Sequence, residues 1–288
     1  MRRCYQFRMT FRMPELPEVE VTRRGIAPAL VGRRLTSAEF RAPALRYPLP
    51  HAQRAAFVGQ RLISLTRRAK YLLLNFGTGH LLIHLGMSGS LRLLPTHTSA
   101  PAQKHDHVDL VFDETTLRMR DPRRFGAMLW LESNELNDIL THPLLAKLGI
   151  EPLDEAFDAH WLKTELTGLK SAIKPMLMDS HRIVGIGNIY ATESLFRAGI
   201  HPRTAAGKIS LARLQRLVPV IKTTLNAAID AGGSSLRDFI HSDGSSGYFQ
   251  QHYFAYGRTG QPCRICGQAI REIKQAQRTT FYCTHCQR

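Results

Sequence analysis

Two closely spaced pairs of cysteines near the C-terminus constrain this chain more than any other feature. The segments CRIC and CTHC form two C-x2-C pairs on either side of residues 267–282. This spacing is typical of a four-thiolate zinc site, in which two tight turns each present two sulfur atoms to a tetrahedral ion. Two disulfides in a secreted protein are the alternative, but no export signal supports them. We therefore expect one structural zinc ion, bound by Cys263, Cys266, Cys283 and Cys286.

The charge of the chain predicts a polyanionic partner. Its 288 residues include 39 Lys and Arg against 23 Asp and Glu, which gives a formal net charge of +16. A folded protein this basic most often meets nucleic acid, although a generally basic surface without a special role is the alternative. No run of about 20 apolar residues is present, so we expect no membrane span and a cytoplasmic protein.

The hydrophobic pattern indicates that the first part of the chain is rich in strands. A short helix comes first, because Val19, Thr22, Ile26 and Leu30 recur at helical spacing. The segments YLLLNF-GTG-HLLIHL and HVDLVF-DE-TTLRMR then each read as two strands joined by a short turn. Strands this closely spaced predict an antiparallel sandwich or barrel.

From about residue 135 the pattern becomes helical. The segment SLARLQRLVPVIKTTLNAAIDAGG predicts a helix with Ser210 as its N-cap and a stop at Gly232 and Gly233. Pro219 lies inside this helix and is expected to kink or divide it, because proline removes one backbone hydrogen bond and clashes with the preceding turn.

Several short motifs carry candidate functional side chains, each with a plainer alternative. Gly185 and Gly187 precede a helix whose N–H groups could bind a phosphate, although such glycines more often form a simple turn. Met87 lies between two glycines, where a core methionine is the commoner outcome. Arg123 and Phe125 could enter a DNA duplex from a loop tip, or be a surface charge beside a core aromatic.

Taken together, these motifs are specific enough to indicate one protein family. From Met13 to the C-terminus the sequence resembles the formamidopyrimidine-DNA glycosylase family, and it resembles the endonuclease VIII branch less, since that branch usually has glycine where this chain has Leu16. The matching motifs are MPELPEVE, RRAKYLLL, HLGMSGSLR, KHDHVDL, DPRRFGA, AIKPMLMD, GIGNIYATESLF, SDGSSGYF and AQRTTFYC.

The resemblance implies a multidomain α+β fold. It places a catalytic antiparallel β-sandwich at residues 14–134 and a helix–two-turn–helix DNA-binding domain at 135–241. A lesion-recognition loop and linker follow at 242–258, and a zinc-finger β-hairpin at 259–288. Residues 1–13 are an extension that we do not expect in the mature protein.

The resemblance also implies a bifunctional glycosylase and AP lyase of base excision repair that acts on oxidised purines, chiefly 8-oxoguanine opposite cytosine. Pro14, as the N-terminal amine, would attack C1′ of a flipped-out nucleotide, and Glu15 would assist as general acid at the ring oxygen. Lys70 would transfer a proton in β-elimination, Arg278 would serve δ-elimination and phosphate binding, and Glu18 would be a supporting carboxylate.

The partner implied by the resemblance is double-stranded DNA that contains an oxidised purine or an abasic site, bound by a monomer close to the nucleoid. Three side chains would fill the void left by the flipped nucleotide, with the arginine facing the orphaned cytosine: Met87, Arg123 and Phe125. Four further residues match contacts to the DNA backbone: His105, Lys170, Lys174 and Asn188.

The start of the chain bears directly on this chemistry. In the sequence as written the Pro14 nitrogen lies in a tertiary amide and cannot act as a nucleophile. We expect translation from Met13 followed by methionine removal, and a removable leader as the second explanation. A protein that keeps its extension and only binds damaged DNA is the third.

Overall fold

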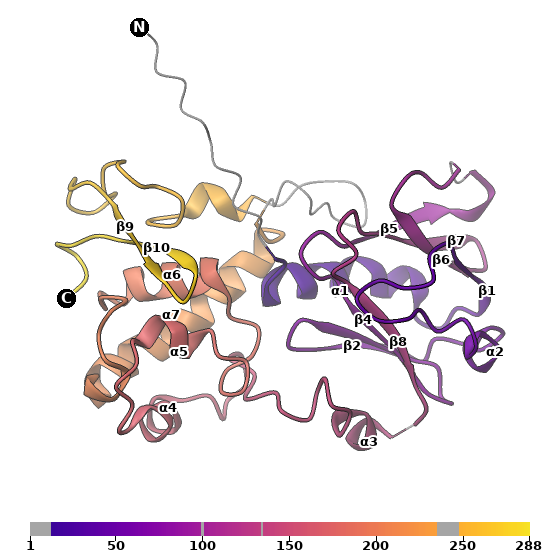
Figure 1. Ribbon diagram of the computed structural model, residues 1–288, viewed down its shortest axis with the longest axis horizontal. Helices are drawn as coiled ribbons and strands as arrows, with labels where there is room; N and C mark the ends of the chain where they lie inside the picture. Colours follow the sequence, from indigo (N-terminus) through magenta and orange to yellow (C-terminus); the bar gives the residue numbers. More distant parts are fainter. Residues whose placement is uncertain (1–12, 99–100, 134, 235–247) are drawn as a thin grey trace, which may run out of the picture.

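The chain folds into two halves that lie side by side, with one helix between them (Figure 1). The computed structural model describes residues 13–98, 101–133, 135–234 and 248–288. Residues 1–12 of the predicted extension and residues 242–247 of the predicted lesion-recognition loop lie outside the described residues.

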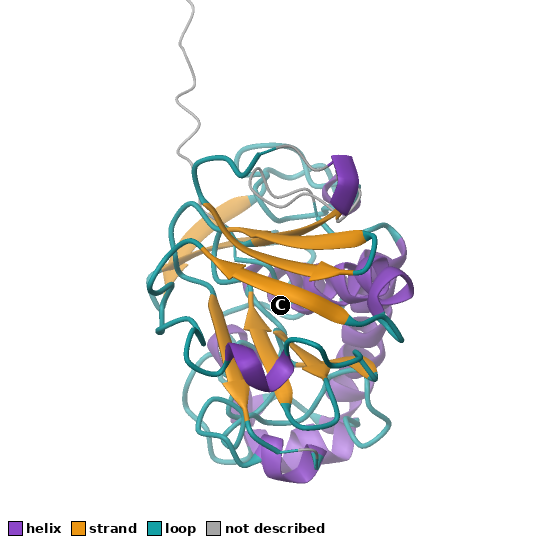
Figure 2. Cartoon of the chain, turned by 90° about the vertical axis from the view of Figure 1, so that its right-hand side faces the viewer, coloured by secondary structure: helices purple, strands orange, loops and turns teal. Residues whose placement is uncertain are grey.

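The first half is a sandwich of two four-stranded antiparallel sheets, stacked as two layers (Figure 2). One sheet has the order β1 (Leu35–Phe40), β6 (Asp106–Phe112), β7 (Thr115–Arg120) and β5 (Ser90–Pro95). The other has the order β2 (Ser64–Arg68), β3 (Tyr71–Asn75), β4 (His80–His84) and β8 (Ala127–Leu131). Both predicted hairpins are confirmed, as β3–β4 and β6–β7. The short helix α2 (Arg54–Phe57) packs Phe57 into the core between the sheets.

Helix α1 (Leu16–Leu30) connects the halves, because it packs on α7 of the second half and on β2, β3 and β5 of the sandwich. The four positions predicted from spacing, Val19, Thr22, Ile26 and Leu30, are all buried. The helix ends at Leu30, with Val31 as its C-cap. Its N-terminus, which carries the candidate catalytic residues, is therefore held at the boundary between the halves.

The second half is built from helices. They are α4 (Ala159–Leu166), α5 (Ile173–Leu177), α6 (Asn188–Arg197) and α7 (Leu211–Asp230). Helix α3 (Leu136–Leu140) lies instead against the sandwich, where Ile139 packs with Leu73, Leu82 and Leu131 (Figure 1). Among the described residues, 3-10 turns occur at Thr96–Thr98, Ala206–Lys208 and Phe249–His252. Helix α7 begins after Ser210, as predicted, but it runs unbroken through Pro219, so the expected division is wrong. A proline inside a helix removes one backbone hydrogen bond and costs about 3 kcal/mol of helix stability. Burial of residues such as Leu214, Ile221 and Leu225 on the same helix offsets it, at about 1.5–3 kcal/mol for each fully buried side chain.

A two-stranded hairpin, β9 (Arg271–Gln275) and β10 (Arg278–Tyr282), packs on α6 near the C-terminus. Its two-residue turn consists of Ala276 and Gln277, both with positive φ, at 44° and 61°. This conformation is the one that a tight hairpin turn demands and that side chains other than glycine adopt reluctantly. The sandwich, the helical region and this C-terminal hairpin confirm the predicted α+β class.

In the part of the chain that the structure describes, no helix is both long enough and apolar enough to cross a bilayer.

Candidate active site

A cavity of about 340 Å³ lies where the start of α1 meets α6 and the β9–β10 hairpin. This volume is in the range of sites for small organic ligands. Its walls come from segments far apart in the sequence. The lining residues are Met13, Glu15, Met87, Gly187, Asn188, Ile189, Tyr256, Gln277, Arg278, Thr279 and Phe281.

Glu15 links the start of α1 to the start of α6. Its buried carboxylate accepts hydrogen bonds from the backbone N–H groups of Gly187 (2.8 Å), Ile189 (3.1 Å) and Tyr190 (3.4 Å). Burial raises the pKa of Glu15, against the opposing effects of the Lys70 charge and these N–H donors. The N–H groups that the sequence suggested for a phosphate are thus already bound by a carboxylate of the chain itself.

Glycine is required where the carboxylate approaches α6. A Cβ atom at Gly187 would lie 2.3 Å from the carboxyl carbon of Glu15. At Gly185, which has a φ of +78°, a Cβ would lie 2.6 Å from that of Leu16. The two glycines of the GIG motif therefore allow α1 to pack closely against α6.

Glu18 lies one helical turn behind Glu15 and is fully buried. Its carboxylate accepts from the backbone N–H of Glu15 at 2.9 Å, the hydroxyl of Tyr190 at 2.6 Å and the backbone N–H of Ser234 at 2.9 Å. Burial, and then the neighbouring Glu15, raise the pKa of Glu18 to about 7. Glu18 thus holds the peptide that presents Pro14 and Glu15.

Lys70 lies in the two-residue turn between β2 and β3 and interacts electrostatically with the start of α1. Burial lowers its pKa, and the charge of Arg278 lowers it further, while Glu15 opposes both effects. A lysine and a carboxylate whose pKa values are moved toward each other are suited to exchange protons.

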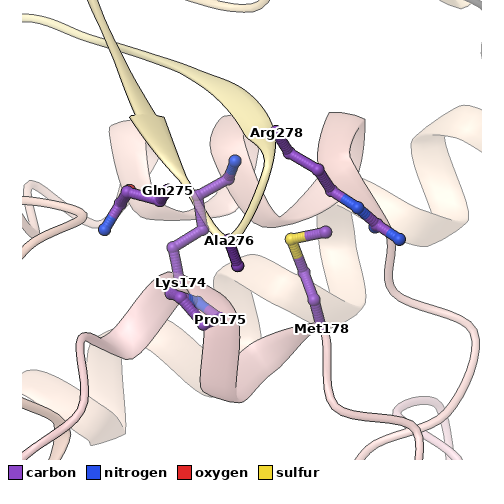
Figure 3. Close-up of a pocket in the computed structure, with 6 residues that line it drawn as sticks. All are labelled: Lys174, Pro175, Met178, Gln275, Ala276 and Arg278. Atoms are coloured by element: carbon purple, nitrogen blue, oxygen red, sulfur yellow. The ribbon is translucent and has the colours of Figure 1, made fainter.

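Arg278 begins β10, and Figure 3 shows its side chain above Met178, the residue that follows α5. It lines the cavity described above and also a second one of about 200 Å³, between the hairpin tip and α5, whose other lining residues are Lys174, Pro175, Met178, Gln275 and Ala276. The exposed guanidinium is therefore free to meet a ligand at the edge of either cavity.

Lys174 is 1% exposed, which is unusual for a lysine predicted to contact the DNA backbone. Its ammonium donates to Asn188 Oδ1 and to Thr280 Oγ1. The Asn188 side chain in turn donates to the Thr279 carbonyl at 3.0 Å. Burial lowers the pKa of Lys174 to about 7. Lys174 and Asn188 thus connect α5 and α6 to the hairpin that carries Arg278.

The three predicted void-filling residues lie on two neighbouring loops of the sandwich. Met87 is half-buried in the loop between β4 and β5 and lines the cavity. Arg123 and Phe125 belong to the loop between β7 and β8, where the guanidinium lies 4.6 Å from the ring centroid. Phe125 is 45% exposed. The alternatives of a core methionine and a core aromatic are therefore both wrong, since Met87 is not a core residue and Phe125 is not buried.

Sequence reasoning missed the pair that joins these loops, Ser88 and Asp121. The Ser88 hydroxyl donates to Asp121 Oδ1 at 2.6 Å, and both residues are buried. Both residues lie inside motifs of the sequence, Ser88 in HLGMSGSLR and Asp121 in DPRRFGA, but nothing in either motif indicated that the two side chains bond to each other.

Two predicted DNA contacts lie apart from the cavity. His105 is half-buried with a φ of 78°, and its carbonyl accepts from the N–H of Asp121 at 3.0 Å, beneath the Arg123 loop. Lys170 is exposed in the connection between α4 and α5. The structure does not bring Lys170 together with the other site residues, and its role stays a prediction.

The four cysteines converge at the base of the hairpin and form the predicted zinc site. All four sulfur atoms lie within 4.8 Å of one another. Cys263 Sγ lies 3.9 Å from Cys286 Sγ, and Cys266 Sγ lies 3.4 Å from Cys283 Sγ. Sulfur atoms bound tetrahedrally to zinc at about 2.3 Å are about 3.8 Å apart, so the geometry fits one closed structural ion.

Three family models match successive parts of the chain. They are the formamidopyrimidine-DNA glycosylase N-terminal domain at residues 13–128, the H2TH domain of the same glycosylase at 148–240, and the zinc finger found in FPG and IleRS at 260–288. The matches begin at Met13, so the residues before it belong to none of the three domains.

Curated relatives are similar over almost the whole chain. The formamidopyrimidine-DNA glycosylase of Aromatoleum aromaticum is 56% identical over 276 residues, and that of Burkholderia multivorans is 52% identical. Each alignment covers 96% of this chain and 100% of the relative.

Solved structures agree with the fold. Lactococcus lactis Fpg in complex with DNA containing an abasic site has a TM-score of 0.86 at 35% identity, over 95% of this chain and 99% of that one. Thermus thermophilus MutM (Fpg) has a TM-score of 0.83 at 36% identity, over 95% and 98%. The chain therefore belongs to the formamidopyrimidine-DNA glycosylase family of enzymes.

Proposed function

We propose that the protein excises oxidised purines, 8-oxoguanine and formamidopyrimidines, from double-stranded DNA and then cleaves the strand by β,δ-elimination. One observation carries this proposal: Met13, Glu15, Met87 and Arg278 converge on a single cavity. Solved Lactococcus lactis relatives bind DNA containing an abasic site or Fapy-dG, which supports the substrate class.

The nucleophile in this proposal is the nitrogen of Pro14, freed as the N-terminus of the mature chain. Pro14 is buried and directly follows Met13, which lines the cavity, so loss of residues 1–13 would leave the Pro14 nitrogen as a free amine next to the position that Met13 occupies. The secondary amine attacks C1′ of the flipped nucleotide, the C1′–base bond breaks, and the base leaves with a proton. The amine then loses its own proton, the C1′–O4′ ring bond opens with protonation of the ring oxygen, and the resulting iminium draws electrons for elimination. The start of the family match at residue 13 supports this placement.

The neighbouring ionisable groups move protons during these steps. Glu15, whose pKa is raised by burial, acts as general acid at the sugar ring oxygen. Lys70, whose pKa is lowered by burial, transfers a proton in β-elimination. Arg278 binds the phosphate and assists δ-elimination, and Glu18 positions the start of α1 through its bond to the Glu15 N–H.

DNA binding follows from the basic charge and the void-filling loops. Met87, Arg123 and Phe125 occupy the space of the flipped nucleotide, with Arg123 toward the orphaned cytosine. We propose His105, Lys170, Lys174 and Asn188 as backbone contacts, and a monomer that acts at the nucleoid. The proposed domain boundaries are 14–134, 135–241, 242–258 and 259–288.

A non-catalytic damaged-DNA binder is the second candidate, favoured by one observation. In the 288-residue chain, Pro14 is joined to Met13 through an amide nitrogen that has no nucleophilic lone pair. A chain that keeps this bond would keep the charge and the void-filling loops but lose the proposed nucleophile.

Single-turnover assays on four duplexes test the proposed substrate class. Residues 14–288, with proline as N-terminus, should release 8-oxoguanine paired with cytosine at least 10-fold faster than 8-oxoguanine paired with adenine. Undamaged guanine in the same sequence should not be released, and an abasic site should be cleaved without base release. Equal rates on damaged and undamaged guanine would refute the proposed specificity.

A further inference from the structure

The loop that carries Met87 and the loop that carries Arg123 and Phe125 share one buried carboxyl group. Asp121 has no exposed surface. Its Oδ1 accepts from the Ser88 hydroxyl at 2.6 Å, and its Oδ2 accepts from the Gly126 N–H at 2.7 Å. The Ser88 oxygen in turn accepts from the Arg123 N–H at 3.1 Å. Two hydrogen bonds therefore join the loops, one donated by Ser88 to Asp121 and one donated by the Arg123 N–H to Ser88.

The two loops also approach each other at the backbone. A Cβ atom at Gly86 would lie 2.4 Å from the carbonyl carbon of Phe125, and the φ of Gly86 is +64°. A Cβ at Gly126 would lie 2.8 Å from the carbonyl oxygen of His84. Glycine at both places lets the peptide before Met87 contact the peptide of Phe125 directly.

The backbone of Asp121 is fixed as firmly as its side chain. Its N–H donates to the His105 carbonyl at 3.0 Å. Its carbonyl accepts from His107 Nε2 at 3.0 Å and from the Arg124 N–H at 3.2 Å. Every polar group of Asp121 is thus bonded, so the carboxyl group cannot turn away from Ser88 without leaving buried donors unpaired.

We propose that Asp121 is a positioning residue that acts through Ser88 to hold Met87, Arg123 and Phe125 as one rigid void-filling unit. This rests on the void-filling role in the proposed function. A unit whose parts are locked together before binding loses less conformational freedom when it enters the duplex. The three side chains should therefore enter or leave the gap together, and breaking the link should make their contributions independent.

The test measures lesion preference, defined as the affinity for a duplex with a tetrahydrofuran abasic analogue opposite cytosine divided by that for the undamaged duplex. The full 288-residue chain is suitable, because binding needs no free Pro14. Ser88→Ala should lower the preference at least 3-fold and change undamaged binding less than 2-fold. Asp121→Asn, whose amide cannot accept at both positions, should act in the same direction. Circular dichroism and zinc content verify folding.

A double-mutant cycle then separates positioning from general stability. With Ser88 present, the double variant Met87→Ala, Phe125→Ala is compared with the product of the fold-losses in preference that the two single variants show. The fold-loss of the double variant should be at least 5-fold smaller than this product. In the Ser88→Ala background the combined loss should match that product within 2-fold. A purely structural role for Ser88 would weaken the protein without changing this coupling.

Matched controls come from the same domain. Ser90→Ala removes the hydroxyl of another buried serine, two residues further on, and should leave the preference unchanged. Gly86→Ala should lower the preference, whereas Gly32→Ala, at a similar φ of +82° with no atom near its added Cβ, should not.

The outcomes distinguish this inference from the proposed function beneath it. If Met87→Ala and Phe125→Ala lower the preference but Ser88→Ala and Asp121→Asn leave it within 2-fold of wild type, the positioning role is refuted and the void-filling role stands. If Met87→Ala and Phe125→Ala leave the preference unchanged, the void-filling role is refuted, and the positioning role with it.

Discussion

The cavity and the void-filling loops are built in opposite ways. The cavity draws its walls from the start of α1, the start of α6 and the C-terminal hairpin, which are brought together across the two halves, and from Met87 of one sandwich loop. Glu15 bonds to a residue 172 positions away, and Lys174 to one 106 positions away. The two loops belong to the sandwich alone and are joined through Ser88 and Asp121. Chemistry should therefore depend on the placement of the halves, whereas lesion sensing should depend on one domain.

The largest effect that separates the two regions is expected from Glu15→Gln. Loss of the general acid should slow base release by residues 14–288 at least about 100-fold. Lesion preference should stay within 3-fold of wild type, because the sandwich loops are untouched. Single-turnover kinetics and fluorescence anisotropy measure the two quantities. Glu114→Gln, an exposed carboxylate in the β6–β7 turn, is the control and should change neither. An equal loss of binding and excision would mean that the regions are not separable.

Removal of zinc should come next. Cys283→Ser should unfold the ribbon, since zinc-binding energy is folding energy in such a site. Arg278 would then leave the cavity, and Thr280 would lose its hydrogen bond from Lys174. DNA affinity should therefore fall at least 10-fold. His285→Ala changes the exposed residue beside Cys286 and should retain both zinc and affinity. Full affinity in a protein shown to be zinc-free by mass spectrometry would contradict this dependence.

The void-filling side chains should give a smaller and more selective effect. Phe125→Ala should weaken binding to the abasic-analogue duplex about 10-fold, since stacking of a base on an aromatic side chain is worth about 1–3 kcal/mol. Met87→Ala should weaken the same binding in the same direction. Binding to undamaged duplex should change less than 2-fold. Ile63→Ala removes another exposed apolar side chain of the sandwich, 59% exposed, and should have no effect. Equal losses on both duplexes would place these side chains outside the lesion contact.

The smallest effect concerns Lys174, whose pKa is lowered from 10.5 to about 7 by burial. Between these values the unfolded chain binds one proton more than the folded chain, so this residue's contribution to stability is lost as pH falls toward 7. From pH 7 to pH 9 the unfolding free energy of wild type should rise by roughly 2 kcal/mol relative to Lys174→Met. Melting curves across that range test this, with the exposed Lys170→Met as control. Parallel curves for wild type and Lys174→Met would show that the ammonium is not desolvated.

Features of the molecule that depend on short motifs could be predicted from the local sequence. The C-x2-C pairs predicted the zinc ligands, and apolar runs separated by short turns predicted the hairpins β3–β4 and β6–β7. Contacts between distant segments could not be predicted this way, because spacing along the chain does not encode them. Burial of Lys174 against Thr280 and the capping of α6 by Glu15 are examples. The expected division of α7 at Pro219 was wrong because local helix rules omit the burial energy of the rest of α7.

The central claim is that the Pro14 nitrogen must be free to react. Borohydride reduction during reaction with an 8-oxoguanine duplex converts the proposed iminium into a stable protein–DNA adduct, whose attachment site peptide mass spectrometry can locate. Residues 14–288 should give the adduct at Pro14, and the rate should fall at acid pH as the amine protonates, since a free α-amino group titrates near pH 7.7–8.0. The intact 288-residue chain should bind the same duplex and give none. An efficient adduct from the intact chain, with residues 1–13 still attached, would show that Pro14 is not the nucleophile.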